Sequence, residues 1–297
     1  MKKLNRRQFL TMIGSTALAG SLFHGAGAVH ALQRSETNPR LLIDPAVLVD
    51  RLDKDAFRIL DIRNDEKYLS GHLPEAIQLW FPEVTVNLNG VPGFVAPPET
   101  VAEAMSTRGI DADTEVIVYG DTGAIWAARM FWVLEYHGHT NARILDGGFP
   151  FWNDSFLPLA LGRVEAEAKT FQPEVQSQKR VDADWVLDHL DDPGVVFVDA
   201  RETDTYNQGH IPGAISKPWL DNIDWDTERF KAFDVLEQRF TESGIVKDRT
   251  VISYCQTGVL SAQNFFTFRL LGYPDVRLYD GSFADWSSNP DRPIESG

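Results

Sequence analysis

The only cysteine of the chain lies where a nucleophile would be expected. Cys255 directly follows the apolar run Thr250–Tyr254, and a helical pattern begins within a few residues. In open α/β sheets, the turn between the carboxyl end of a strand and the next helix is where ligands bind. Five residues after the cysteine can present successive backbone amides to an anion, aided by the helix dipole: Gln256, Thr257, Gly258, Val259 and Leu260. Both effects stabilise a thiolate, so the predicted chemistry is nucleophilic attack by sulfur.

Two other interpretations of Cys255 are open. One is an inert core thiol at the end of a strand, which its position before a helix makes the weaker reading. The other is a phosphatase of the Cys-x5-Arg kind, which needs an arginine six residues after the cysteine to grip phosphate. That position is Ser261, which argues against a phosphatase.

An internal repeat carries this cysteine in one copy only. Three blocks recur in the same order: 61–77 with 199–215, 116–123 with 251–258, and 145–152 with 279–286. A repeat of this length is a domain with its own core rather than a solenoid unit. In the first copy Gly120 stands at the place of the cysteine. We expect two domains, at 40–155 and 178–292, joined by a linker at 156–177.

Short apolar runs alternate with helical patterns in each copy. Residues 58–62 and 195–199, like 115–119 and 250–254, have the length of buried strands in a parallel sheet. Helical patterns follow the latter two runs. This order predicts an α/β fold in which each domain is a parallel sheet with helices on both faces.

Composition and charge argue against several classes of protein. The chain has 297 residues and a formal net charge of −15, whereas a nucleic-acid binder needs a cationic face. With one cysteine, neither an intramolecular disulfide nor a cysteine-based zinc cage is possible. His137 and His139 are an isolated pair, so we expect no metal site there. Asp146 and Asp280, each followed by a glycine, are expected to fasten a glycine turn.

The first 31 residues have the pattern of an export signal. Four basic residues precede its apolar stretch: Lys2, Lys3, Arg6 and Arg7. Residues 9–28 are small and apolar with no acid, and residues 5–10 resemble the twin-arginine motif. No later stretch is long and apolar enough to span a bilayer. The predicted location is the periplasm, with no membrane association once the signal is removed; an uncleaved anchor is the alternative.

Two sequence blocks resemble the signatures of the rhodanese family. The Asp-x-Arg…Tyr…Gly-His-x-Pro pattern occurs in both copies, and Asp-Gly-Gly-Phe-x-x-Trp occurs at 146–152. The resemblance covers nearly the whole chain after the signal. It implies two tandem rhodanese-like domains, the first catalytically silent and the second active. It also implies transfer of a sulfane sulfur, through a cysteine persulfide, to a thiophilic acceptor such as cyanide or a thiol.

The resemblance assigns roles to individual residues. The Cys255 thiolate would attack the outer sulfur of a small anionic donor and become a persulfide, held by the amides of residues 256–260, with no metal or organic cofactor. Arg201 would lie near this loop and bind the donor. The alternative for Arg201 is a structural ion pair, because Arg63 repeats it in the silent copy. Features shared by both copies, such as His210, are more consistent with scaffold.

The donor is less well defined than the reaction. Thiosulfate-specific members of the family often carry Arg and Lys after the cysteine, whereas this loop has no cation. We favour thiosulfate slightly over 3-mercaptopyruvate, because an exported protein meets inorganic sulfur compounds more readily. A non-enzymatic sulfur carrier or binding protein is the alternative function. We expect a monomer, because two similar domains can cover each other's interfaces.

Overall fold

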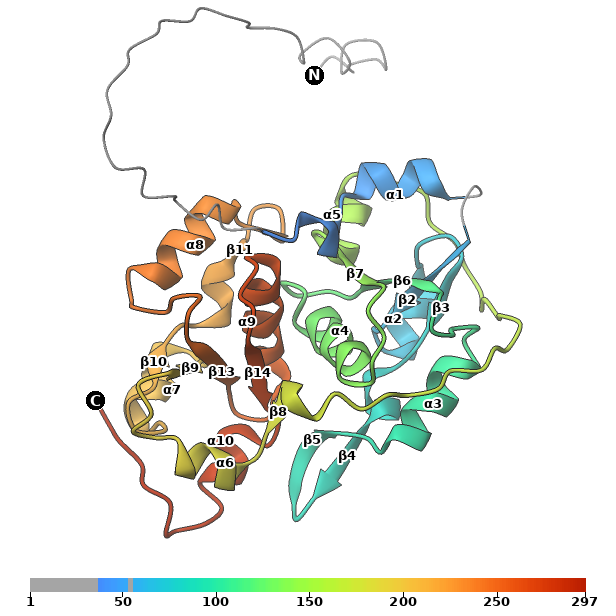
Figure 1. Cartoon of the computed structure of the whole chain (residues 1–297). Helices are drawn as coiled ribbons and strands as arrows, with labels where there is room; N and C mark the ends of the chain where they lie inside the picture. The colour runs from blue at the N-terminus through green and yellow to red at the C-terminus, as the bar shows by residue number, and fades with distance from the viewer. Residues whose placement is uncertain (1–36, 53–55) are drawn as a thin grey trace, which may run out of the picture. The chain divides into compact units, whose positions relative to one another are not determined.

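The computed structural model describes residues 37–52 and 56–297, and the predicted export signal at 1–31 lies outside them. Two five-stranded sheets organise the described chain (Figure 1). The first has the strand order β1-β7-β6-β2-β3, all parallel. Its strands are β1 (Leu42–Ile43), β2 (Phe57–Asp61), β3 (Ala76–Gln78), β6 (Glu115–Tyr119) and β7 (Ala142–Leu145).

The second sheet repeats this topology in the C-terminal half. Its order is β10-β9-β13-β14-β8, again all parallel. Its strands are β8 (Arg180–Val181), β9 (Val195–Asp199), β10 (Ile215–Ser216), β13 (Thr250–Tyr254) and β14 (Val276–Tyr279). In both halves the central strand pair ends with an aspartate opposite a tyrosine, Asp61 opposite Tyr119 and Asp199 opposite Tyr254.

Helices connect the strands in both halves. In the first half they are α1 (Pro45–Arg51), α2 (Asp65–Ser70), α3 (Pro98–Ser106), α4 (Ile125–Tyr136) and α5 (Gly148–Asp154). In the second half they are α6 (Ala183–Asp188), α7 (Thr203–Gln208), α8 (Phe233–Thr241), α9 (Val259–Leu270) and α10 (Ser282–Trp286). The α/β prediction is therefore confirmed.

Alternate strand residues face opposite sides of each sheet. In the first sheet, Leu60 and Val118 belong to the core that contains α4, whereas Ile59 and Ile117 pack on the other side with Trp152 of α5. The second sheet divides in the same way between the core that contains α9 and a smaller core that contains α6 and α10. Helices therefore cover both faces of each sheet, as predicted.

One hydrophobic core joins the two halves. Helices α4 and α9 lie side by side between the sheets (Figure 1). Ten of the twelve residues of each helix are buried, which marks them as interior helices rather than amphipathic surface ones. Phe131 and Phe266 meet edge to face across this contact, with ring centroids 4.9 Å apart. The two halves of the described chain are thus parts of one compact unit.

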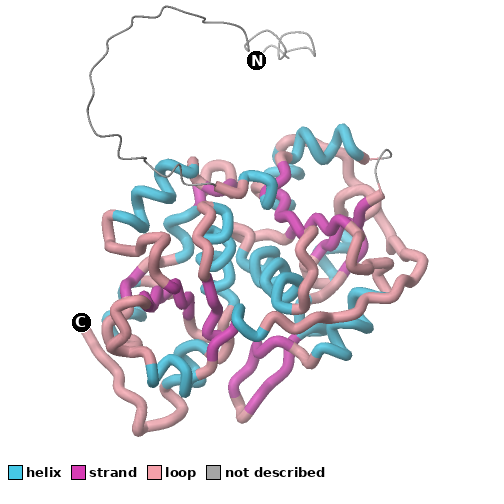
Figure 2. The backbone as a smooth tube through the Cα atoms, in the orientation of Figure 1, coloured by secondary structure: helices cyan, strands magenta, loops and turns pink. Residues whose placement is uncertain are grey.

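Two small antiparallel hairpins, absent from the sequence prediction, complete the fold. They are β4–β5 (Thr85–Leu88 and Val91–Val95) and β11–β12 (Ile223–Asp224 and Arg229–Phe230). The linker expected at 156–177 is mostly irregular backbone (Figure 2). It is bound to the first half, since Ala160 forms an isolated bridge with His72.

The expectation that Asp146 and Asp280 fasten their own glycine turns is wrong. The Asp146 carboxylate accepts hydrogen bonds from Arg229 Nε (2.7 Å) and from the Phe230 amide (3.0 Å), both in the other half. Asp280 likewise accepts from the Val95 amide (3.0 Å). Each aspartate therefore binds the hairpin of the opposite half. Burial raises the pKa of Asp146, and the charge of Arg229 opposes that rise.

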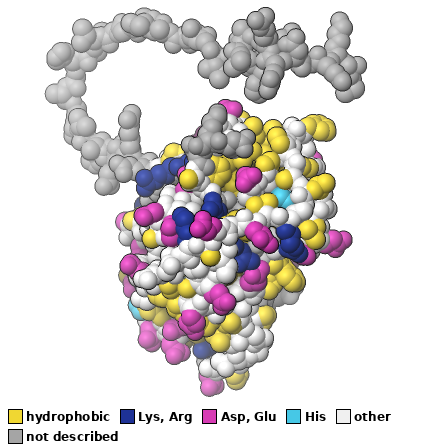
Figure 3. Space-filling view, turned by 90° about the vertical axis from the view of Figure 1, so that its right-hand side faces the viewer, with side chains coloured by type: hydrophobic (Ala, Val, Ile, Leu, Met, Phe, Trp, Pro, Cys, Tyr) yellow, Lys and Arg dark blue, Asp and Glu magenta, His cyan; other side chains and the backbone are white. Residues whose placement is uncertain are grey.

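Charged side chains of both signs lie on the surface of the described chain (Figure 3). On the face drawn in Figure 3, basic side chains lie scattered among acidic ones rather than in one patch. Within residues 37–52 and 56–297, no helix is both long and apolar enough to cross a bilayer.

Candidate active site

The backbone of Cys255 is held on both sides at the end of β13. Its amide donates to Ser282 Oγ (3.1 Å), and its carbonyl accepts from the Phe283 amide (3.0 Å). Its Sγ accepts a hydrogen bond from Ser261 Oγ, 3.5 Å away in the first turn of α9. Ser261, the residue that argued against a phosphatase, thus contacts the sulfur itself.

Gly258 makes the turn from this strand into α9 possible. It is the N-cap of α9 and has φ +83°. A Cβ at this position would lie 2.6 Å from the Asp280 carbonyl oxygen. Both the left-handed backbone and the close approach therefore require glycine.

The loop after Cys255 retains unused hydrogen-bond donors. Among the described residues, no group accepts from the backbone amides of Gln256, Thr257 or Gly258. Val259 and Leu260 open α9, where amides have no acceptor inside the helix. This run of free donors is consistent with the predicted anion nest.

The walls around the thiol are apolar. Cys255 is 1% exposed and clusters with Ile125, Ala200 and Trp219. Three partly buried residues pack against this cluster: Trp126, Leu220 and Leu260. Ile125 and Trp126 come from the first half, so both halves build the site. A donor must reach the sulfur past the partly buried residues, in surroundings that strengthen electrostatic interactions.

Arg201 occupies a buried ion pair near the site. Its Nε and Nη2 donate to the Asp199 carboxylate (2.6–3.0 Å), and Nη2 also donates to the Gly209 carbonyl (2.7 Å). Burial acts to lower the pKa of Arg201, but Asp199 outweighs it, and Cys255 adds a smaller upward contribution. Arg201 thus lies within electrostatic range of the thiol while being committed to its own half.

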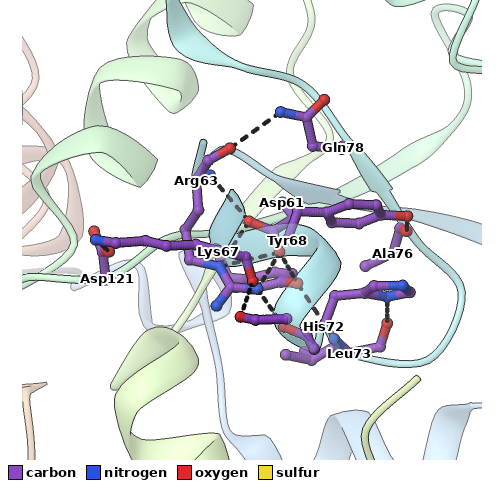
Figure 4. Close-up of polar contacts among 12 residues, drawn as sticks. Asp61, Arg63, Lys67, Tyr68, His72, Leu73, Ala76, Gln78 and Asp121 are labelled. Atoms are coloured by element: carbon purple, nitrogen blue, oxygen red, sulfur yellow. Dashed lines mark hydrogen bonds and ion pairs between the residues drawn. The ribbon is translucent and has the colours of Figure 1, made fainter. Parts of the chain in front are cut away.

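The first half has the same ion pair. Arg63 donates to both carboxylate oxygens of Asp61 and to the Gly71 carbonyl (2.8 Å), as Figure 4 shows for the aspartate. Since Arg63 does this without a cysteine nearby, the geometry favours the structural interpretation of Arg201.

The shared histidines also have scaffold contacts. His72 stacks on Tyr68 and His210 stacks on Tyr206, with ring centroids 4.1 and 3.7 Å apart. Figure 4 shows the His72 ring beside Tyr68, with its hydrogen bond to the Leu73 carbonyl.

His137 and His139 are buried. They bond to the carbonyls of Val133 and Thr114, respectively, and burial lowers the pKa of both. Among the described residues, no group of three or more potential metal ligands is present.

In the first half, the loop that corresponds to residues 255–258 is occupied by a side chain of the second half. The Gly123 amide donates to Glu228 Oε2 (2.7 Å), which belongs to the β11–β12 hairpin of the other half. Gly93 in the β4–β5 hairpin lies against the active loop, and its Cβ would stand 3.1 Å from the Thr257 carbonyl oxygen. A carboxylate therefore fills one loop, whereas a glycine leaves the other free.

Ser282, Arg129 and the two hairpins belong to the site but are not predicted from the sequence. Ser282 takes the place of Gly148 in the repeat, and both have positive φ, +54° and +55°. A serine at a left-handed glycine position was the available signal, because such a conformation is uncommon outside glycine. Arg129 of α4 lies outside the repeated sequence blocks, so the repeat does not point to it.

The matches to known proteins follow the two halves. The family model of the rhodanese-like domain matches residues 44–155 and 182–289. The chain belongs to the rhodanese family. The family model thus matches each half of this rhodanese separately.

The matches to several relatives cover nearly the whole length of those proteins. The chain is 30% identical to the sulfur carrier protein TtuD of Thermus thermophilus (88% of this chain, 98% of that protein). It is 27% identical to the thiosulfate sulfurtransferase of Azotobacter vinelandii (86% and 97%) and 28% identical to the 3-mercaptopyruvate sulfurtransferase of Escherichia coli K12 (84% and 95%). The prediction of a tandem-domain rhodanese sulfurtransferase is confirmed.

A solved structure agrees with this family. The chain matches EanB in a complex with ergothioneine covalently linked to a cysteine persulfide, with a TM-score of 0.78 and 26% identity. The match covers 87% of this chain and 70% of EanB. A sulfur-bearing cysteine therefore occurs in a protein of similar fold.

Replacing Gly258 tests whether the loop geometry sets the reactivity of the thiol. Gly258→Ala is expected to cost at least about 1–2 kcal/mol from the left-handed backbone alone, and the contact with Asp280 adds to this. The rate at which iodoacetamide alkylates Cys255 should also change, because the substitution displaces the loop that follows the thiol. Gly213→Ala is the control, because φ there is +70° but nothing lies within 4 Å of the new Cβ. Equal effects of the two substitutions on stability and alkylation would contradict this account.

Proposed function

We propose that this rhodanese moves a sulfane sulfur from a small anionic donor to cyanide or a thiol through a persulfide on Cys255. The observation that carries the proposal is a lone cysteine bonded to Ser261 and followed by free loop amides. The family and its named sulfurtransferases support it.

The two half-reactions balance without a redox partner. The Cys255 thiolate attacks the outer sulfur of thiosulfate, the sulfur–sulfur bond of the donor breaks, and sulfite leaves with the electron pair. The amides of Gln256, Thr257 and Gly258 stabilise the negative terminal sulfur of the persulfide. Cyanide then attacks that sulfur, thiocyanate leaves, and the electron pair returns to Cys255. The proposed cycle needs no metal or organic cofactor.

The walls of the site bear on the donor. Trp219, Leu220 and Leu260 are apolar, and no residue from 256 to 260 is cationic. Within the loop itself, binding of the donor anion therefore falls to backbone amides. We propose thiosulfate rather than 3-mercaptopyruvate as the donor, because the proposed periplasmic location exposes the protein to inorganic sulfur compounds. We propose a monomer, because α4 and α9 already cover each other.

A sulfur carrier is the second candidate function. The relative TtuD is named a sulfur carrier protein and spans most of this chain. In a carrier, the persulfide on Cys255 would be handed to a protein partner rather than to a small acceptor. The buried thiol, 1% exposed, favours small reactants and therefore the enzyme.

Loss of the thiol should abolish transfer. Cys255→Ser is expected to reduce thiocyanate formation from thiosulfate and cyanide to background, because the attacking sulfur is gone. Mass spectrometry of the wild type incubated with thiosulfate should show an adduct of about 32 Da, one sulfur atom, that cyanide removes. Equal turnover by wild type and variant would rule out an enzyme at this site. An adduct without turnover would favour the carrier.

Arg201 and Arg63 can be compared directly. If Arg201 is structural, Arg201→Lys and Arg63→Lys should destabilise the fold by similar amounts, and KM for thiosulfate should stay within about twofold of wild type. Loss of a charged hydrogen bond to the donor, worth about 1.5–3 kcal/mol, would instead raise KM by roughly tenfold or more. Such a rise in Arg201→Lys alone would establish the donor-binding role predicted from the sequence.

We also propose export to the periplasm by the twin-arginine route. The basis is the basic and apolar pattern of residues 1–31. Changing both Arg6 and Arg7 to Lys should leave the full chain in the cytoplasmic fraction, while the wild type is periplasmic. Unchanged export of the double variant would argue against this route.

A further inference from the structure

Arg129 is an arginine of the silent half that reaches the active loop. It lies on α4, and its side chain is fully buried. Nη1 donates to the Gly258 carbonyl (3.3 Å), and Nη2 donates to the Gly93 carbonyl (2.8 Å). Nη2 also pairs with the Asp280 carboxylate, whose side chain is 0% exposed. One guanidinium therefore joins α4, the β4–β5 hairpin and two segments of the second half.

The two segments of the second half enclose the nucleophile. Gly258 is the N-cap of α9, at the end of the loop that Cys255 begins. Asp280 follows β14, and two residues later Ser282 accepts the hydrogen bond of the Cys255 amide (3.1 Å). Arg129 is thus bonded to both chain segments that define where the sulfur lies.

Stability alone does not explain a charge pair in this place. Taking a guanidinium and a carboxylate out of water costs several kcal/mol per ion, and apolar residues of similar volume often do as well or better. The surroundings are suited to such residues, since Trp132 lies under the guanidinium at 4.5 Å. What apolar residues lack is the planar fork that fixes carbonyl and carboxylate groups in one geometry.

We propose that Arg129 is a positioning residue for the Cys255 loop, so that the silent half completes the active site. This inference rests on the proposed function, because the loop it positions is the one that would hold the persulfide. Arg129 acts through Gly258 and Asp280, and it does not touch the sulfur itself.

The other aspartate of the repeat provides a control arginine beside the loop that has no cysteine. Arg229 binds Asp146, the counterpart of Asp280, with Nε–Oδ2 at 2.7 Å. It also joins the two halves, and its Nη2 pairs with Asp44 (2.8 Å). Because Arg229 lies beside the loop without a cysteine, its loss should disturb the contact between halves but not the thiol.

The experiment compares Arg129→Met, Arg129→Lys and Arg229→Met in the full chain. Displacement of a reacting group by about 1 Å lowers rates by up to roughly 100-fold. Arg129→Met should therefore reduce kcat for thiocyanate formation by about 10- to 100-fold and shift the pH profile of Cys255 alkylation by iodoacetamide. Arg129→Lys should recover part of both, because it retains the charge but loses the fork. Arg229→Met should match wild type in both, while urea unfolding measures the stability that each variant loses.

Equal changes in kcat and alkylation for Arg129→Met and Arg229→Met would overturn the proposal, since both then act only through stability. An unchanged alkylation profile in Arg129→Met would also overturn it. If Arg129→Met does not fold, the same comparison is made between Arg129→Lys and Arg229→Lys. If the wild type forms no thiocyanate, the proposed function fails, and the alkylation profiles still decide the role of Arg129.

Discussion

The two halves of this rhodanese are held in one arrangement by aspartates that exchange partners across the repeat. Asp146 and Asp280 stand at the same place in each copy, and each binds a backbone amide and an arginine from the other half. Buried carboxylates need such partners, because an unpaired charge in the core is strongly destabilising. The packing of α4 on α9 supplies apolar burial, whereas the hydrogen bonds of these aspartates fix the orientation of one half on the other. The loop after Cys255 depends on the packing of α4 on α9 and on Asp280.

Near-symmetry makes the differences between the halves informative. The first half has Gly120 where the second has Cys255, and its loop amide at Gly123 is bonded to Glu228. In the second half, no described group accepts from the amides of Gln256, Thr257 or Gly258, and a glycine, Gly93, faces the loop. Glu228 thus occupies an amide in the first loop that has no counterpart partner in the loop after Cys255. The first half has the same fold, and its Ile125 and Trp126 pack around Cys255 of the second half.

The burial of the thiol limits what can react there. Cys255 is nearly covered and lies among aliphatic and indole groups, with Ser261 as its polar contact. Such surroundings disfavour a charge unless dipoles stabilise it, and the loop amides can do so in a site with little water. Small anions, such as the proposed donor, fit these conditions better than large substrates do.

The sequence by itself determined the repeat, the parallel sheets, the family and the place of Cys255. Those features are local: apolar runs of strand length, glycine positions and spaced motifs are readable along the chain. Only the tertiary structure decided that Asp280 serves the opposite half, that Arg201 is held by Asp199, and that Arg129 reaches Gly258. These contacts join residues from elements that the chain order does not place side by side. A buried arginine in an apolar helix has no meaning in the sequence until its carbonyl and carboxylate partners are known, because its charge must be satisfied by whichever groups the packing brings to it.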